Sequence, residues 1–209
     1  MKRVLTVDNI LSQEIEVIEW EGEMYEAFGN PQAKGVWFIW ATSGSGKSSF
    51  VMALCKALAK YYKVFYNPLE EGTNDLGFQE RVKMYNMSEV KKNFHAQVYN
   101  LEELTEYLNV KRSPPKVVVI DSARYLFKSY SDYEALKESF PDIIFLITGH
   151  GKGQLPKTSM EEDIMFDAYQ KIRVDAYAAQ CKSRSIGPNG GRFIIWEKKY
   201  NELMGATHE

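Results

Sequence analysis

The chain has 209 residues, of which 44% are hydrophobic and 26% charged, and a formal net charge of −2 at pH 7. These values indicate a soluble globular protein with a full core, and they exclude a chain-wide basic surface, so any nucleic-acid contact must come from a local patch. The two cysteines, Cys55 and Cys181, lie far apart without a CxxC pair, which argues against a disulfide and fits a reducing cytosol. We find no signal peptide and no apolar run of membrane-spanning length, so we expect a cytoplasmic protein without a membrane partner.

Residues 1–34 are mixed in character and acidic, and we expect them to form an N-terminal extension, such as a short strand or arm. From Gly35 to residue 204, short apolar runs alternate with helical patterns, which predicts one domain (35–204) followed by a tail at 205–209. The expected strands of its first part are 36–40, 63–66, 96–99, 116–120 and 143–147, and the expected helices are 47–60, 76–86, 101–109, 131–139 and 160–169.

Short, continuous apolar strands that alternate with helices are typical of a parallel sheet covered on both faces. Further strand-like runs follow at 171–175, 177–181 and 192–196, and a Gly- and Pro-rich turn at 187–191 separates the last two. Connections this short favour antiparallel pairing. We therefore predict an α/β fold with a mostly parallel central sheet flanked by helices and a C-terminal antiparallel extension.

The segment after the first strand, residues 41–49, has the composition and context of a phosphate-binding loop. Glycines let the backbone approach a phosphate closely, and the loop N–H groups and the positive end of the following helix surround the anion. Lys47 adds a charge at the β- and γ-phosphates, and the Ser48 hydroxyl binds Mg²⁺. Ala41 stands where such loops usually begin with glycine, and the alternative is a flexible linker without a ligand. The residues expected to hold the nucleotide are Thr42, Ser43, Gly44, Ser45, Gly46, Lys47, Ser48 and Ser49.

A carboxylate follows the Val-rich strand 116–120, at Asp121. An acid at this strand end can hold Mg²⁺ through its water shell. The alternative is an Asp that caps a helix or begins a turn, which is common after strands. Because a phosphate-binding loop is also present, we predict the metal role for Asp121.

Polar residues follow two other strands. Glu70 and Glu71 come just after strand 63–66, where one carboxylate can polarise the water that attacks the γ-phosphate; the alternative is a solvated acidic turn. His150 follows strand 143–147 in a Gly-rich stretch, where it can contact the γ-phosphate and report its loss; the alternative is a structural histidine.

These four signals, in this order, resemble the RecA-like P-loop ATPases, especially the branch that contains DnaB-type helicases, RadA-type recombination proteins and KaiC-like ATPases. The resemblance covers about residues 29–200. It implies that Glu70 is the catalytic base, with Glu71 second, and that His150 occupies the position of the family's glutamine or histidine switch. It also implies that strand 143–147 lies between the phosphate-loop strand and the strand that ends at Asp121.

The segment Lys182-Ser183-Arg184 is similar to the family's Lys-Asn-Arg segment, which reaches the nucleotide of a neighbouring subunit, with Ser183 in place of the usual Asn. The resemblance implies that Lys182 and Arg184 act as fingers in trans, and such fingers contribute on the order of 10³–10⁵ in rate. The alternative is a solvated strand end. A finger in trans requires a head-to-tail homo-oligomer, either a ring or a filament.

The resulting hypothesis is Mg²⁺-dependent ATP hydrolysis, with 151–163 at the position of the family's DNA-binding loop. Lys152 and Lys157 could meet single-stranded DNA there in recombination or replication, but the segment's tail is acidic and has no stacking aromatic residue, so a long loop without ligand is an alternative. A KaiC-like or partner-regulated ATPase without DNA binding, and a nucleotide-binding interaction module with little turnover, also stay open. A small-molecule kinase fits less well, because an arginine-rich lid is missing from the sequence.

Overall fold

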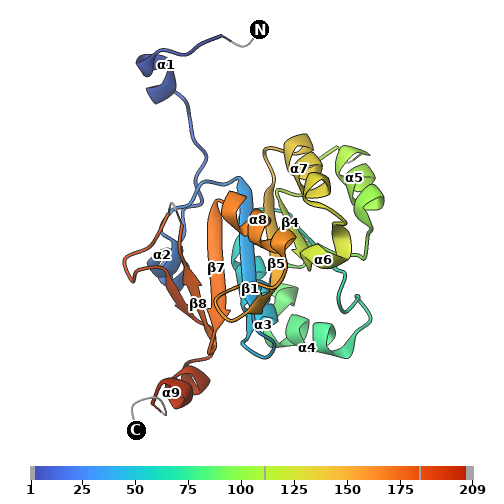
Figure 1. Cartoon of the computed structure of the whole chain (residues 1–209), viewed down its shortest axis with the longest axis vertical. Coiled ribbons are helices and arrows are strands. Elements are labelled where there is room, and N and C mark those ends of the chain that lie inside the picture. The colour runs from blue at the N-terminus through green and yellow to red at the C-terminus, as the bar shows by residue number, and fades with distance from the viewer. Residues whose placement is uncertain (1–2, 111, 184, 206–209) are drawn as a thin grey trace.

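The computed structural model describes residues 3–110, 112–183 and 185–205, and it shows the expected α/β architecture (Figure 1). Its strands form one sheet in the order β3-β2-β4-β5-β1-β7-β8-β9, with β6 paired to β5. The strands are β1 (Gly35–Ala41), β2 (Val64–Pro68), β3 (Phe94–Ala96), β4 (Val117–Asp121), β5 (Ile144–Lys152), β6 (Leu155–Pro156), β7 (Gln170–Asp175), β8 (Ala178–Cys181) and β9 (Arg192–Ile194). Within the sheet, the neighbouring strands β3, β2, β4, β5, β1 and β7 pair in parallel. The pairs β7–β8, β8–β9 and β5–β6 are antiparallel.

Strand β5 lies between β1 and β4, as the resemblance implied. In this register Ala41, the last residue of β1, pairs with His150 of β5. Pro68 at the end of β2 pairs with Asp121 at the end of β4. The residues that follow these strands therefore meet at one edge of the sheet, which is where open α/β sheets bind ligands.

Helices cover both faces of the sheet (Figure 1). Each of the five predicted helices is present, with ends that differ by a few residues at most. Four short helices and the strand β6 were not predicted. The helices are α1 (Val7–Leu11), α2 (Gly22–Phe28), α3 (Lys47–Leu58), α4 (Leu76–Met84), α5 (Leu101–Val110), α6 (Ala123–Leu126), α7 (Tyr130–Ser139), α8 (Ser159–Asp167) and α9 (Glu197–Gly205), with a 3₁₀ turn at Met87–Val90.

Alternate side chains of β1 enter two separate cores. Trp37 and Ile39 pack in the cluster that contains the buried residues of α3, whereas Phe38 and Trp40 pack in the cluster that contains those of α5, α7 and α8. Because both faces are buried, the strand reads as a continuous apolar run without alternation.

The expected N-terminal extension contributes to the first of these cores. Ile18, Trp20 and Phe28 are buried with the sheet residues, and the Phe28 ring lies 6.0 Å from that of Trp37. Helix α1, in contrast, buries none of its residues and lies at the end of an extended arm (Figure 1). The N-terminal segment therefore has a packed part that is continuous with the domain and an exposed part that is not.

In the part of the chain that the structure describes, every helix is too short or too polar to cross a membrane.

Candidate functional site

A cleft of about 430 Å³ opens at the carboxyl edge of the parallel strands. It collects most of the residues that were predicted from widely separated parts of the sequence; among the described ones, Lys152, Lys157 and Lys182 lie outside its lining. The lining residues are Ala41, Thr42, Ser43, Gly44, Ser45, Gly46, Lys47, Ser48, Ser49, Glu70, Glu71, Arg81, Asp121, His150 and Tyr177.

The loop between β1 and α3 forms one wall of the cleft. Gly44 (φ +78°) and Gly46 (φ +95°) adopt left-handed conformations, and a Cβ on Gly46 would lie 3.0 Å from the Tyr177 ring. Helix α3 begins at Lys47, so its first N–H groups face this loop. Ala41 belongs to the extended strand β1, where glycine's conformational freedom is not required. The departure from the usual loop pattern at Ala41 therefore introduces no strain.

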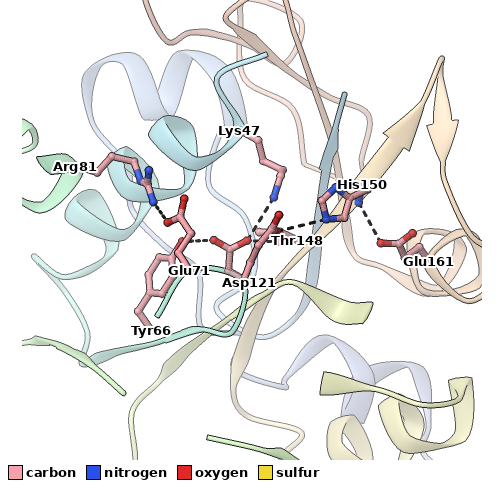
Figure 2. Close-up of polar contacts among 9 residues, drawn as sticks. Lys47, Tyr66, Glu71, Arg81, Asp121, Thr148, His150 and Glu161 are labelled. Atoms are coloured by element: carbon pink, nitrogen blue, oxygen red, sulfur yellow. Dashed lines mark hydrogen bonds and ion pairs between the residues drawn. The ribbon is translucent and has the colours of Figure 1, made fainter. Parts of the chain in front are cut away.

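Asp121 occupies the centre of the site (Figure 2). Its Oδ1 accepts a hydrogen bond from the Thr148 hydroxyl at 2.5 Å and lies 3.4 Å from the Lys47 Nζ, and its Oδ2 accepts from the Tyr66 hydroxyl at 2.7 Å. Burial opposes ionisation of this carboxyl group, but Lys47 and the two hydroxyl donors outweigh it and hold the pKa of Asp121 below its ordinary value. Asp121 is therefore an ionised carboxylate at neutral pH.

The helix-cap alternative for Asp121 is not what the structure shows, because Ser122 is the N-cap residue of α6 and the Asp121 carboxylate faces Lys47. Ser48, the second residue of α3, lines the same cleft. A hydroxyl and a carboxylate beside a phosphate-binding loop form an oxygen donor set that fits Mg²⁺, which binds proteins through one or two such groups together with water and substrate phosphates. Thr148 and Lys47 already contact Oδ1, and Oδ2, which accepts from Tyr66, keeps one acceptor position free for a water molecule bound to Mg²⁺.

The two adjacent acids have different partners. Glu71 forms an ion pair with Arg81 of α4 (Figure 2), whereas the Glu70 Oε2 lies 3.4 Å from the His150 Nε2. This second contact is within ion-pair distance but lacks hydrogen-bond geometry, and the His150 Nε2 is buried without a hydrogen-bond partner among the described residues. Glu71 is thus paired with a cation, whereas Glu70 faces His150.

Sequence reasoning missed Tyr66, Thr148 and Tyr177. Tyr66 and Thr148 are buried inside strands, and only the fold reveals that they meet Asp121. Tyr177 lies at the tip of the β7–β8 hairpin, where it and Ala176 both have positive φ, as a two-residue type I′ turn requires. Its ring contacts that of Trp196 edge-on at 5.4 Å between centroids and lines the cleft beside Gly46. A single aromatic residue in a turn carries no sequence signal for this role.

Two further expectations fall outside the cleft. Lys182 is exposed just beyond β8, at the end away from Tyr177, and its N–H donates to the Lys171 carbonyl at 2.8 Å. Arg184 lies outside the described residues.

The segment 151–163 is not a long loop, because β5 continues to Lys152, β6 pairs back onto it, and α8 begins at Ser159. Lys152 and Lys157 are both exposed on this hairpin.

No protein-family profile matches the sequence, and no curated protein has a detectably similar sequence. The fold, however, is similar to that of a KaiC-like protein from the archaeon Pyrococcus horikoshii OT3, with a TM-score of 0.63 and 17% identity over 87% of this chain and 99% of that one. It is also similar to the flagellar accessory protein FlaH from Methanocaldococcus jannaschii, with a TM-score of 0.57 and 14% identity over 86% and 92% of the two chains. The ATP synthase subunit NeqB from Nanoarcheaum equitans gives a TM-score of 0.50 and 9% identity over 72% of this chain and 48% of that one. The chain therefore has the fold of the RecA-like P-loop ATPases, as predicted.

Proposed function

We propose that this RecA-like chain binds ATP with Mg²⁺ in the cleft and hydrolyses it. The observation that carries the proposal is the convergence of Lys47, Asp121, Glu70 and His150, from four separate segments of the chain, on a cleft walled by the 41–49 loop. Their chemistry suits these positions. Lys47 supplies a cation beside the loop amides at the phosphates, Asp121 supplies an ionised acid for the metal, and Glu70 supplies a second acid for the attacking water.

In this mechanism Lys47 and the loop N–H groups of residues 42–49 hold the phosphates. Ser48 and Asp121 would hold Mg²⁺, which would neutralise charge that develops on the phosphates. The water oxygen bonds to the γ-phosphorus as the bond to the β-phosphate oxygen breaks, which releases ADP and phosphate. Glu70 accepts the proton of the attacking water, because Arg81 already neutralises Glu71. His150, next to Glu70, contacts the γ-phosphate, and Tyr177 packs against the nucleotide base.

Lys182 and Arg184 are proposed to act on the nucleotide of a neighbouring copy. The exposed position of Lys182, outside its own cleft, supports a role in trans rather than in cis. A head-to-tail contact of this kind forms a ring or a filament. The free, buried thiols of Cys55 and Cys181 agree with a reducing cytoplasm.

The likeness to a KaiC-like protein supports the KaiC-like alternative for this ATPase. An ATPase stimulated by single-stranded DNA is the second candidate, and the observation in its favour is that Lys152 and Lys157 are exposed on the hairpin that leaves His150. A nucleotide-binding module with little turnover is the third.

One set of rate measurements distinguishes these functions. ATP hydrolysis by the wild-type protein and by Lys47→Ala is measured with and without single-stranded DNA, at low and high salt. We expect magnesium-dependent turnover that Lys47→Ala abolishes. Stimulation by DNA that weakens as salt rises would select the DNA-dependent function. Saturable ATP binding without turnover, with or without DNA, would contradict the hydrolase and leave the binding module.

A further inference from the structure

The carboxylate of Glu161 is completely buried next to the site, with 0% of the residue exposed. Its Oε2 accepts hydrogen bonds from the Thr158 hydroxyl at 2.9 Å and from the Thr158 N–H at 3.2 Å, and the Glu161 N–H donates to the Thr158 hydroxyl at 3.2 Å. These contacts form the capping box of α8. The other oxygen of Glu161, Oε1, accepts a hydrogen bond from the His150 N–H at 3.1 Å (Figure 2). One oxygen therefore caps a helix, and the other holds strand β5 at the proposed switch residue.

Helix capping alone does not account for this arrangement. Helix α7 has a capping box of the same kind, in which Asp132 accepts, among the described residues, only from the N–H groups of Lys128 and Ser129 at the start of its own helix. The longer side chain at Glu161 reaches a backbone N–H eleven positions earlier in the chain. Complete burial of a carboxylate is costly unless each oxygen is satisfied, so the bond to His150 is an integral part of the site.

Both backbone polar groups of His150 are held by the segment that starts α8. The His150 carbonyl accepts from the Lys157 N–H at 2.8 Å, while its N–H donates to Glu161. The preceding residue leaves little freedom, because a Cβ on Gly149 would lie 2.5 Å from the Phe38 ring. The direction of the His150 imidazole, whose Nε2 lies 3.4 Å from Glu70, thus depends on where Glu161 holds the backbone.

We propose that Glu161 is a positioning residue for His150: its carboxylate sets the end of β5 so that the imidazole faces Glu70 and the phosphate position. This inference rests on the proposed hydrolysis, because it concerns the geometry of the same site. Glu161 itself does not touch the substrate in this account, and its effect passes through the His150 backbone.

The test uses a substitution that removes the hydrogen bond of one Glu161 oxygen to His150 and keeps the capping bond of the other. Glu161→Asp retains the charge and, as Asp132 of α7 demonstrates, an aspartate at this helix position can complete a capping box; the shorter side chain, however, cannot also reach His150. Thr158→Val is the complementary control, since it removes the capping hydroxyl and leaves the His150 bond in place. Glu162→Gln, on the same helical turn, controls for charge. All variants are first compared by thermal melting.

The first readout needs no catalysis. Amide hydrogen exchange at His150, resolved by NMR without nucleotide, is expected to be about tenfold faster in Glu161→Asp and unchanged in Glu162→Gln and Thr158→Val, because only Glu161→Asp loses that hydrogen bond. The second readout is single-turnover hydrolysis, which is expected to fall about tenfold in Glu161→Asp, since small misplacements of a catalytic group have large effects, while the Kd for ATP stays within about twofold. If Glu161→Asp does not fold, Glu161→Met, which is similar in length and lacks an oxygen acceptor for the His150 N–H, is measured in the same way.

Equal exchange and equal turnover in Glu161→Asp and Thr158→Val would overturn the proposal and leave Glu161 as a helix cap. Failure of the proposed function gives a different result: the wild-type protein would not hydrolyse ATP at all, and faster exchange in Glu161→Asp would still establish the structural link to His150.

Discussion

At the scale of single residues, the site is organised by how its charges are paired. Arg81 neutralises Glu71, and Lys47 with two hydroxyl donors stabilises the ionised Asp121. Glu70, in contrast, lies next to His150, which is the proposed sensor of the γ-phosphate. The two adjacent glutamates are therefore distinguished by their partners, and the partner of Glu71 is a cation ten positions farther along the chain, in helix α4.

This pairing predicts different effects of two matched substitutions. Glu70→Gln removes the proposed base and should lower kcat by about 10³-fold, at the middle of the range for general base catalysis, with an ATP Kd within about twofold of the wild type. Glu71→Gln should lower kcat less than about tenfold. Steady-state hydrolysis and calorimetric binding measure the two quantities, and a larger loss in Glu71→Gln than in Glu70→Gln would reverse the assignment.

Tyr177 gives a second prediction at this scale. If its ring packs against the base, Tyr177→Ala should weaken ATP binding about tenfold, within the range of a base–aromatic contact, and Tyr177→Phe should bind like the wild type. Titration with ATP and with inorganic triphosphate distinguishes base contact from a general effect on the loop. A loss of equal size for both ligands would show that Tyr177 supports the 41–49 loop instead.

The sequence predicts a site residue where a side chain of suitable chemistry follows an apolar strand. Lys47 and Asp121 each follow an apolar strand in a recognisable pattern, and both line the cleft. Tyr66, Thr148 and Glu161 were not predictable, because a hydroxyl in a strand or an acid in a helix gives no local sign of its distant partner. Such partners are set by strand order and register, which a single sequence does not encode in any short window.

At the scale of secondary-structure elements, helix α8 is tied at both ends. Lys157, just before the helix, and Glu161 in its first turn hydrogen-bond to the His150 backbone of β5, and Asp167 at its end accepts hydrogen bonds from Tyr133 and from the Lys137 Nζ of α7. Burial acts against ionisation of Asp167, but these two donors outweigh it and lower the pKa of Asp167 below the ordinary value of 3.8. The helix that positions His150 is thus fixed to a neighbouring helix by a partly exposed charge.

This lowered pKa has a consequence for acid stability. An acid with a lower pKa in the folded state stabilises the fold at pH values above 3.8, and that contribution is lost as the pH falls through the folded pKa. Wild type should therefore be more stable than Asp167→Asn by about 1 kcal/mol at pH 7, with the difference shrinking toward pH 3. Urea unfolding at both pH values checks this, and a difference that does not change with pH would contradict the role of the charge.

Helices and strands with a strong apolar pattern were predicted from the sequence, whereas very short ones were not. Helix α6 and strand β6 are too short to display a period, and α2 becomes visible only through the burial of Ala27 and Phe28 against the sheet. The strand expected at 96–99 is displaced to Phe94–Ala96, because this edge strand pairs only with Val64–Tyr66 of β2. Tertiary contacts, rather than local propensity, set these boundaries.

At the scale of the whole molecule, the exposed Lys182 predicts a site that is shared between copies. Lys182→Ala should lower kcat at least tenfold, because a cation from the neighbour stabilises charge on the transferring phosphoryl group. Mixing Lys182→Ala with Lys47→Ala should restore part of the activity, since some interfaces then combine an intact cleft with an intact finger. A mixture no more active than the two proteins measured separately would contradict a contribution in trans.

The central claim is that the 41–49 loop and Lys47 hold the triphosphate of ATP. Isothermal titration calorimetry of the purified chain with ATP and Mg²⁺ tests it most directly, with Lys47→Ala as the matched variant. We expect saturable binding of one ATP per chain that needs magnesium and weakens at least tenfold in Lys47→Ala, because the lysine charge contacts the β- and γ-phosphates. Absence of saturable binding, or equal binding by the two proteins, would contradict the account.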